Sequence, residues 1–153
     1  PDAVVLSVGG GGLLSGVIEG LQRNGLYDIP VIAVETEGAA SFRAAVEAGQ
    51  PVELEHINTV ASSLGAKMVC EQAVRLVGLH PVISEVVTDE EAVRACRRFI
   101  DDHRVVTEPA CGASLACIYE QKAVLKAFRN PLVIVCGGAT MSAEQLFSLY
   151  GGA

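Results

Sequence analysis

Residues 3–23 read AVVLSVGGGGLLSGVIEGLQR, and this stretch decides the fold. The apolar run Ala3–Val8 predicts a buried strand, and the spacing of apolar residues after it predicts a helix over Leu13–Arg23. Four glycines, Gly9 to Gly12, join the two segments. Without side chains the backbone can adopt positive φ, and a ligand can approach its N–H groups directly. The helix start adds unpaired N–H donors and a positive dipole end, which predicts an anion cradle suited to a phosphate. A tight turn without a ligand is the alternative.

The rest of the chain alternates strand and helix patterns. The expected strands are Pro30–Glu35, Val82–Val87, Val105–Val106 and Leu132–Cys136. The expected helices are Ser41–Ala48, Met68–Val77 and Pro109–Phe128, with a short helix or turn over Thr59–Leu64. Two further helices are expected to begin with capping boxes at Thr88 and Ser142. Buried strands separated by helices predict an α/β fold with a parallel sheet covered by helices. Ligands of such sheets bind beyond the carboxyl ends of the strands. Three features follow strand ends and are expected to line one crevice: Gly9–Gly12, Glu35–Ser41 and Cys136–Gly138.

Size and composition favour one globular domain. Of the 153 residues half are hydrophobic and only 19% are charged, which is enough for a real core. The net charge of −7 argues against nucleic acid or an anionic membrane as a partner, because no basic cluster offsets it. The apolar runs are too short to span a bilayer, and no secretory signal is visible. Pro1 is not a natural initiator, so we expect the natural N-terminus to lie upstream.

The cysteines favour a cytoplasmic protein with reduced thiols. Their number is odd, and no C-x-x-C spacing occurs among Cys70, Cys96, Cys111, Cys117 and Cys136. Zinc binding is not expected, because the three histidines have no ligand spacing to these cysteines.

Two other phosphate-binding classes can be compared with the glycine run. A P-loop is excluded, because no Gly-Lys-Ser/Thr follows the glycines. A dinucleotide-binding domain stays open: it requires a third glycine where this chain has Ser15, but Glu35 at the end of the second strand matches the acid that binds a ribose.

Four segments occur in an order that points elsewhere: SVGGGGL at 7–13, ETEGA at 35–39, EPACGA at 108–113 and VCGG at 135–138. Together they resemble the C-terminal part of a fold-type II pyridoxal-phosphate enzyme (tryptophan synthase beta-like). The closest resemblance is to the L-serine dehydratase/L-threonine deaminase family and its serine-dehydratase-like relatives. It covers nearly the whole chain. The cysteine at 136 selects this branch, since many relatives carry serine there.

The resemblance implies a set of site residues. The N–H groups of Gly9, Gly10, Gly11, Gly12 and Leu13 would hold the phosphate of pyridoxal 5'-phosphate, and Cys136 would lie beside the pyridine nitrogen. A thiol is a weak donor and cannot keep the ring protonated as a carboxylate would. Without the family, Cys136 reads as a small buried hydrophobe.

A monovalent cation, with potassium expected, is implied beside the phosphate loop. Its ligands would come from Glu35, Ala39 and Ser41 and from the carbonyls of Leu64 and Ala66, and oxygen ligands suit hard cations. Related racemases carry a second carboxylate where this chain has Ser41, so one charge fewer favours a monovalent ion. The alternative for Glu35 is a carboxylate at a helix N-terminus or in a loop.

The lysine that carries the cofactor in this family lies in a Ser-x-Lys-x-Arg-like motif, and Lys67, Lys122 and Lys126 do not match it. The resemblance therefore implies that residues 1–153 are the C-terminal portion of the catalytic domain, without the N-terminal lysine-bearing segment and without a catalytic residue of their own. The intact parent would be a cytoplasmic homodimer of amino-acid catabolism and gluconeogenesis that converts L-serine to pyruvate, or L-threonine to 2-oxobutanoate, with release of ammonia. The isolated chain is predicted to be inactive. A non-catalytic module that binds a phosphate ligand is the alternative function.

Overall fold

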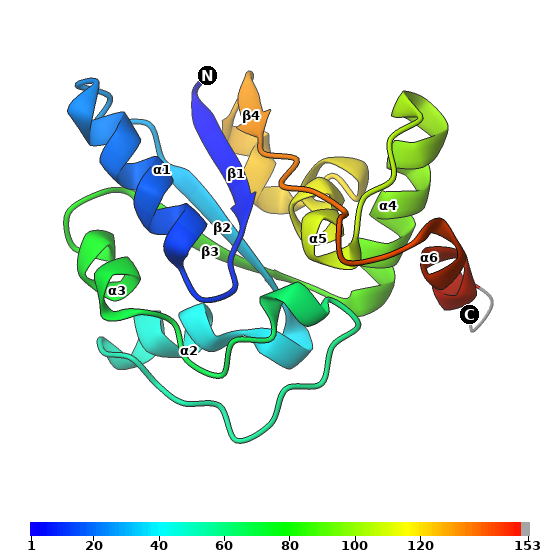
Figure 1. The fold of residues 1–153 in the computed structure, drawn as a ribbon. Helices are drawn as coiled ribbons and strands as arrows, with labels where there is room; N and C mark the ends of the chain where they lie inside the picture. Colours follow the sequence, from blue (N-terminus) through cyan, green and yellow to red (C-terminus); the bar gives the residue numbers. More distant parts are fainter. Residues whose placement is uncertain (151–153) are drawn as a thin grey trace.

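Four parallel strands form the centre of the molecule (Figure 1). The structure, a computed structural model, describes residues 1–150. The strands are β1 (Ala3–Ser7), β2 (Val31–Thr36), β3 (Val82–Val87) and β4 (Pro131–Val133), in the sheet order β3-β2-β1-β4. Val4 of β1 lies opposite Val31 of β2 on one side and Leu132 of β4 on the other. The predicted parallel sheet is confirmed.

Helices connect the strands and cover the sheet. They are α1 (Gly12–Arg23), α2 (Ser41–Ala48), α3 (Glu71–Val77), α4 (Asp89–His103), α5 (Pro109–Tyr119) and α6 (Ala143–Tyr150), with short 3₁₀ turns η1 (Glu37–Ala39), η2 (Ser62–Leu64) and η3 (Ala123–Ala127). Both predicted capping boxes are present: the Thr88 hydroxyl accepts the Glu91 N–H at 3.1 Å, and the Ser142 hydroxyl accepts the Gln145 N–H at 3.2 Å. None of the helices in residues 1–150 has the length and apolar character needed to cross a membrane.

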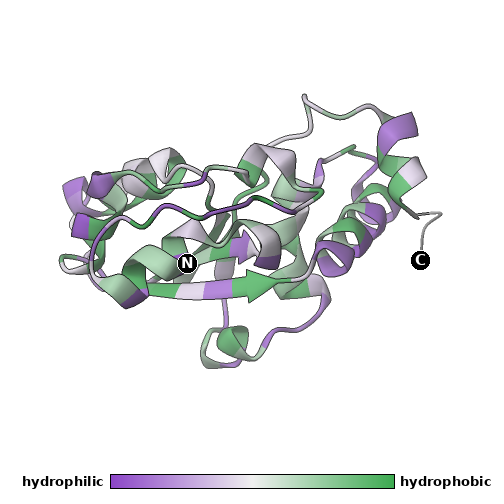
Figure 2. Cartoon of the chain, turned by 90° about the horizontal axis from the view of Figure 1, so that it is seen from below, coloured by the Kyte–Doolittle hydropathy of each residue, from purple (hydrophilic) through white to green (hydrophobic). Residues whose placement is uncertain are grey.

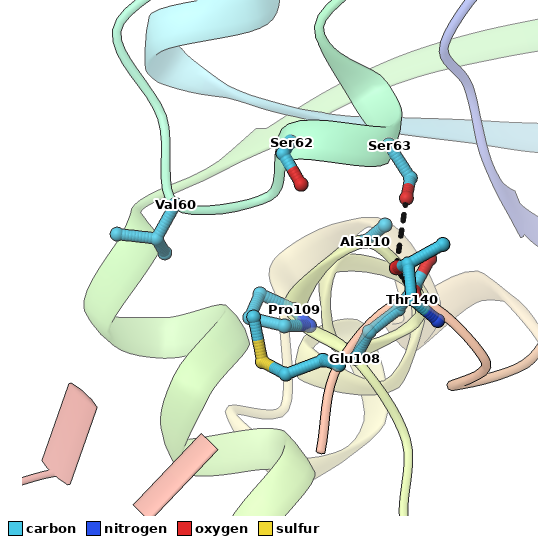
Figure 3. A pocket seen from close by; sticks show the side chains of 8 residues that line it. Val60, Ser62, Ser63, Glu108, Pro109, Ala110 and Thr140 are labelled. Atoms are coloured by element: carbon cyan, nitrogen blue, oxygen red, sulfur yellow. Dashed lines mark hydrogen bonds between the residues drawn. The ribbon is translucent and has the colours of Figure 1, made fainter. Parts of the chain in front are cut away.

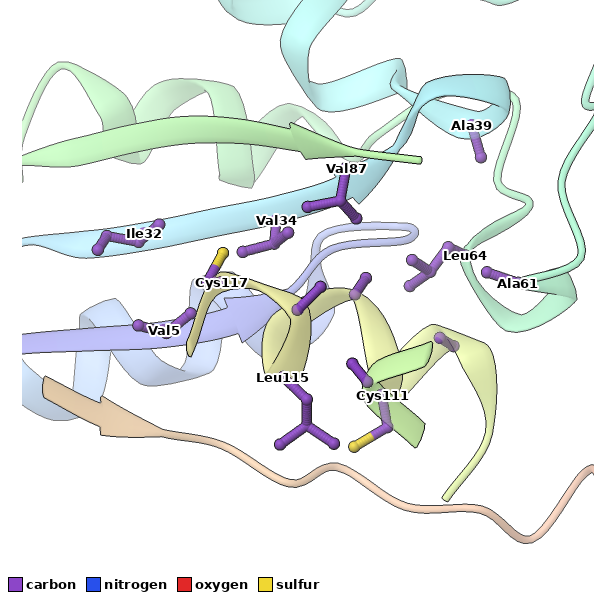
Figure 4. Close-up of a cluster of buried hydrophobic side chains, with 14 of the residues drawn as sticks. Val5, Ile32, Val34, Ala39, Ala61, Leu64, Val87, Cys111, Leu115 and Cys117 are labelled. Atoms are coloured by element: carbon purple, nitrogen blue, oxygen red, sulfur yellow. The ribbon is translucent and has the colours of Figure 1, made fainter. Parts of the chain in front are cut away.

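The two faces of the sheet bury alternate residues of each strand, as the period of two in a strand requires. Val4 and Leu6 pack in one cluster with residues of α1, α2 and α3. Ala3 and Val5 pack in a second cluster, mainly with α5, which Figure 4 shows against the sheet. Figure 2 shows hydrophobic residues along much of the visible strand and hydrophilic residues on the surrounding helices and loops.

Small residues let α5 fill the layer between the sheet and α4. Every residue from Pro109 to Cys117 is buried. A Cβ on Gly112 would lie 2.2 Å from the Ala92 carbonyl oxygen and 2.6 Å from the Cys96 sulfur, both on α4. The glycine therefore sets how closely these two helices approach.

The first and last strands are joined at their starts. The Asp2 carboxylate accepts the N–H groups of Arg129 at 2.6 Å and Asn130 at 2.9 Å. Immediately after these residues, Pro131 of β4 lies opposite Ala3 of β1. β4 thus pairs with β1 and forms one edge of the sheet.

Three expected elements differ from the structure. The predicted strand at Val105–Val106 is wrong, because no strand forms there and both side chains are exposed. The predicted helix over Pro109–Phe128 ends at Tyr119, because Gln121 adopts a left-handed φ of 50°, and η3 follows.

The last strand is shorter than the predicted Leu132–Cys136 and ends at Val133. The Ile134 N–H still donates to the Val5 carbonyl at 2.9 Å, but the Ile134 carbonyl accepts the Ser114 hydroxyl at 3.2 Å. The chain has therefore left the sheet ladder for α5 when it reaches Cys136. The other predicted strands and helices are confirmed, with bounds that differ by a few residues at most.

Candidate functional site

The tetraglycine segment forms an open turn between β1 and α1. Gly11 adopts φ 89° and caps α1, and the first intrahelical bond runs from the Ser15 N–H to the Gly11 carbonyl at 3.0 Å. The N–H groups that precede Ser15 lie before this bond and are the unpaired donors of a helix start. Gly10, Gly12 and Leu13 are exposed. The turn is accessible to an anion, as the cradle requires.

Neighbouring segments hold this turn in place. A Cβ on Gly11 would lie 2.7 Å from a methyl of Val69, and a Cβ on Gly9 would lie 3.0 Å from the Ser63 carbonyl oxygen. By contrast, a Cβ on Gly10 or Gly12 would meet nothing within 4 Å. Gly9 and Gly11 thus serve close packing, whereas Gly10 and Gly12 leave open space above the backbone.

The η2 turn links the glycine turn to the chain after β4. A shallow pocket lies there, lined by Val60, Ser62, Ser63, Glu108, Pro109, Ala110, Thr140 and Met141 (Figure 3). Its polar rim is a chain of contacts: the hydroxyls of Ser63 and Thr140 lie 3.3 Å apart, and the Glu108 carboxylate accepts both the hydroxyl and the N–H of Thr140. Glu108, at the start of α5, thus holds the C-terminal segment against η2.

Cys136 is exposed, contrary to its reading as a buried hydrophobe. The next residue, Gly137, accepts the Glu108 N–H on its carbonyl at 3.2 Å. Because β1 and β4 are parallel neighbours, the glycine turn and Cys136 both follow strand ends on the same edge of the sheet. Figure 1 shows this arrangement, with the β1–α1 turn and the chain after β4 at that edge.

Glu35 is fully buried at the end of β2. Its Oε1 accepts the Phe42 N–H at 2.7 Å and its Oε2 accepts the Arg43 N–H at 2.8 Å, both in the first turn of α2. Burial raises the pKa of this carboxyl to about 7, although the two N–H donors act in the opposite direction. Glu35 thus occupies the helix N-terminal position that was its alternative assignment, and it lies beside Ser41.

The other predicted cation ligands lie around the same buried edge. Ser41 is fully buried, and its hydroxyl has no hydrogen-bond partner among the described residues. Ala39 and Leu64 pack in one cluster, and the Leu64 carbonyl accepts the Ala66 N–H at 2.7 Å. The described residues contain no group of three or more His, Cys, Asp or Glu that could hold a metal. A cation here would depend on Glu35, the Ser41 hydroxyl and backbone carbonyls, and the unpaired Ser41 hydroxyl fits that requirement.

Two of the three lysines have partners away from the glycine turn. The Lys67 ammonium donates to the Glu55 carbonyl at 3.1 Å and is exposed. The Lys122 ammonium binds the Glu91 carboxylate at 2.6 and 2.8 Å, and Lys126 lies in η3.

The four-stranded parallel sheet, its covering helices and the open glycine turn after β1 define an α/β domain. Comparison with known proteins gives the family: residues 1–137 match the sequence profile of the family described as pyridoxal-phosphate dependent enzyme. The chain belongs to this family.

Individual relatives show which members of this family the chain resembles. A Homo sapiens protein named L-serine dehydratase/L-threonine deaminase is 52% identical over 157 residues, covering 97% of this chain and 48% of that protein. A Mus musculus protein named serine dehydratase-like is 48% identical over the same coverage. The crystal structure of a fungal L-serine ammonia-lyase from Rhizomucor miehei matches with a TM-score of 0.94 and 38% identity, covering 99% of this chain and 50% of that one. The fold is thus that of the fold-type II enzymes, and the chain spans about half the length of the relatives it matches.

Three residues of this region were not expected from the sequence. Ser63 and Thr140 lie 77 positions apart, and nothing in the pattern of either segment indicates that they meet. Cys111 gave a weak signal: it follows Glu108-Pro109, the start of a helix, where a thiol experiences the positive end of the dipole.

Proposed function

We propose that this chain is the cofactor-phosphate-binding part of a pyridoxal-phosphate-dependent L-serine/L-threonine ammonia-lyase. The reaction of the intact protein would release ammonia from L-serine or L-threonine and leave pyruvate or 2-oxobutanoate. The observation that supports it most is the open turn with exposed Gly10, Gly12 and Leu13 at the start of α1. The names of the relatives supply the substrate class.

The residues of this chain have separate roles in the proposal. Gly9 to Gly12 and Leu13 direct N–H groups and the helix dipole toward the cofactor phosphate and bind it without a side chain. The Cys136 thiol provides a neutral partner for the pyridine nitrogen. When bound, pyridoxal phosphate supplies the electron sink of the reaction. A thiol beside that ring withdraws less charge than a carboxylate counter-ion would, and this favours elimination over transamination.

A potassium ion beside the phosphate turn is part of the proposal. The ligands would be the Glu35 carboxylate, the Ser41 hydroxyl and the carbonyls of Ala39, Leu64 and Ala66. The buried Ser41 hydroxyl without a partner among residues 1–150 supports it, because an unpaired buried polar group costs free energy unless a ligand satisfies it. A single carboxylate suits one positive charge better than two.

Further parts of the proposal concern the whole protein. We infer a cofactor-bearing lysine in an N-terminal segment that completes the domain represented here by residues 1–153. We also infer a homodimer, a cytoplasmic location and a place in amino-acid catabolism that feeds gluconeogenesis. The similarity to proteins about twice as long supports the first of these.

Two glycines allow a clean test of the phosphate cradle. In a Gly10→Ala/Gly12→Ala double variant the new methyl groups meet no protein atom within 4 Å, so the chain keeps its fold and only ligand approach is obstructed. We expect binding of pyridoxal phosphate and inorganic phosphate, measured by equilibrium dialysis, to be lost. The matched control is Gly16→Ala/Gly20→Ala in α1, where a Cβ also meets nothing within 4 Å, and binding should be kept. Equal binding by both double variants would refute the cradle.

A further inference from the structure

Cys111 has no role in the proposed function, yet it lies beside a residue that does. Cys111 stands in the first turn of α5 and is fully buried, whereas Cys136 follows β4 and is exposed. The two thiols shift each other's pKa in opposite directions. The two residues come from segments 25 positions apart.

Hydrogen bonds on both sides hold these segments together. The Ser114 hydroxyl lies 2.9 Å from the Cys111 carbonyl oxygen and 3.2 Å from the Ile134 carbonyl oxygen, so a single side chain joins α5 to the chain just before Cys136. Just after Cys136, the Gly137 carbonyl accepts the Glu108 N–H at 3.2 Å. The residues before and after Cys136 are therefore both hydrogen-bonded to the start of α5, and these bonds keep the backbone of Cys136 close to that of Cys111. A disulfide requires such closeness, with Cα atoms about 4.4–6.8 Å apart.

The two thiols differ in how readily they lose a proton. Interaction with Cys136 lowers the pKa of the Cys111 thiol to about 7 despite burial, with help from the N–H groups of Gly137 and Cys136. The same interaction, together with desolvation, raises the pKa of the Cys136 thiol above its usual range. The negative charge of Glu108 opposes ionisation of both thiols. The pair therefore holds one thiolate near neutral pH, on Cys111, while Cys136 keeps its proton.

We propose that Cys111 and Cys136 are a redox modification site, at which a peroxide-class oxidant joins the two sulfurs in a reversible disulfide. The exposed Cys136 is the sulfur that a small oxidant reaches. The buried Cys111 is the partner that completes the bond.

The chemistry balances with hydrogen peroxide as the only co-reactant. The Cys136 sulfur attacks one peroxide oxygen as the Cys111 thiolate accepts the Cys136 proton, the O–O bond breaks, and a sulfenic acid and hydroxide form. The Cys111 sulfur then attacks the Cys136 sulfur, the S–O bond breaks, and a second hydroxide leaves. The two thiol protons convert both hydroxides to water. Two electrons pass from the sulfurs to the peroxide, and a dithiol such as dithiothreitol reverses the change.

The remaining cysteines provide contrasts within the same chain. Burial raises the pKa of Cys96 to about 11 and of Cys117 to about 12, so both stay protonated and out of reach of solvent. Cys70 is exposed but lies beside Ser15, with its sulfur 4.0 Å from that hydroxyl. Cys70 is thus the internal reference for an accessible thiol outside the pair.

The test maps disulfides in the full 153-residue chain after treatment with hydrogen peroxide. We expect mass spectrometry to find Cys111 and Cys136 in one cross-linked peptide pair, with the loss of maleimide labelling at Cys136 and its recovery in dithiothreitol. In Cys111→Ser, dimedone should trap a sulfenic acid on Cys136, and Cys70 should remain labelled by maleimide throughout. A wild-type chain in which Cys136 oxidises while Cys111 stays a free thiol would overturn the proposal, whether or not the variant folds.

The regulatory meaning of the pair rests on the proposed function, which places Cys136 at the cofactor ring. Oxidation removes the thiol hydrogen there, so we expect the disulfide form to retain less pyridoxal phosphate in dialysis than the reduced form. Equal retention would overturn this control of the cofactor. The cross-link itself does not require a cofactor, and the Gly10→Ala/Gly12→Ala variant should form it normally. Failure of the cradle and failure of the redox pair are thereby distinguished.

Discussion

At the scale of single residues, Glu35 presents a carboxylate to the protein interior. Both of its oxygens accept backbone N–H groups of α2, yet burial keeps its pKa at about 7. The folded chain therefore binds a proton that the unfolded chain, with a pKa near 4.5, has already released. In this interval the folded state carries more protons, so stability falls as pH rises.

This difference gives a testable pH dependence. In a buffer without small cations, the free energy of unfolding should fall by on the order of 3 kcal/mol as pH rises from about 4.5 to about 7, and should change little from this group above that pH. Urea unfolding across this range measures it. Glu35→Gln removes the titrating group, so its slope over the same interval should be flatter. A variant with the wild-type slope would assign the titration to another residue.

Potassium should act on the same carboxylate. An ion bound at Glu35 and Ser41 favours the ionised form and stabilises the native state by mass action. At neutral pH we expect a higher melting temperature in potassium than in sodium, and a higher one in sodium than in a bulky organic cation. Ser41→Ala should reduce the difference between potassium and the bulky cation. Identical melting temperatures in all three salts would count against the site.

At the scale of elements, the contact between α4 and α5 depends on one missing methyl group. Gly112→Ala places a Cβ 2.2 Å from the Ala92 carbonyl oxygen, so one helix must shift. We expect a destabilisation of about 1–3 kcal/mol in chemical unfolding, the usual cost of overpacking. Gly16→Ala in α1 is the control: its Cβ meets nothing within 4 Å, and the change should stabilise by about 0.5–1 kcal/mol. Equal effects at both positions would show that helix propensity alone decides.

The elements that the sequence predicts well are those with local signals. The apolar run of β1 and the capping box at Thr88 depend on neighbouring residues only, and the structure has both. The strand expected at Val105–Val106 fails because two adjacent β-branched residues are not enough to recruit a partner strand. The end of α5 is set by the left-handed Gln121, a backbone choice that no apolar spacing reveals.

The candidate site likewise has parts that the sequence reveals and parts that it does not. The glycine turn is visible in the sequence because its chemistry needs glycine at consecutive positions. The proximity of Cys111 and Cys136, and that of Ser63 and Thr140, arises from packing between distant segments and has no local pattern. The helix-capping role of Glu35 depends on two N–H groups of α2, and it was one of two assignments that the sequence left open.

At the scale of the whole molecule, the chain has the exposed glycine turn proposed to bind phosphate but no lysine in the family's motif. Incubation with pyridoxal phosphate and reduction with borohydride should therefore give no stoichiometric lysine adduct by mass spectrometry. Lys67 already donates to the Glu55 carbonyl, and Lys122 is held by Glu91. The urea-unfolded chain sets the background for non-specific reaction. One adduct per chain on Lys67 would contradict our assignment of that residue.

The pairing of β1 with β4 also bears on how the chain folds during synthesis. Asp2 binds the backbone of Arg129 and Asn130, so this side of β1 is covered only after residues 129–133 have left the ribosome. Until then β1 has β2 as a neighbour on one side and an open edge on the other, and open edges recruit strands of other chains. Contacts of such long sequence separation form slowly. β1 therefore keeps one open edge while the residues between β2 and β4 are synthesised, and a segment of this kind is a natural client for chaperones that shield apolar surfaces.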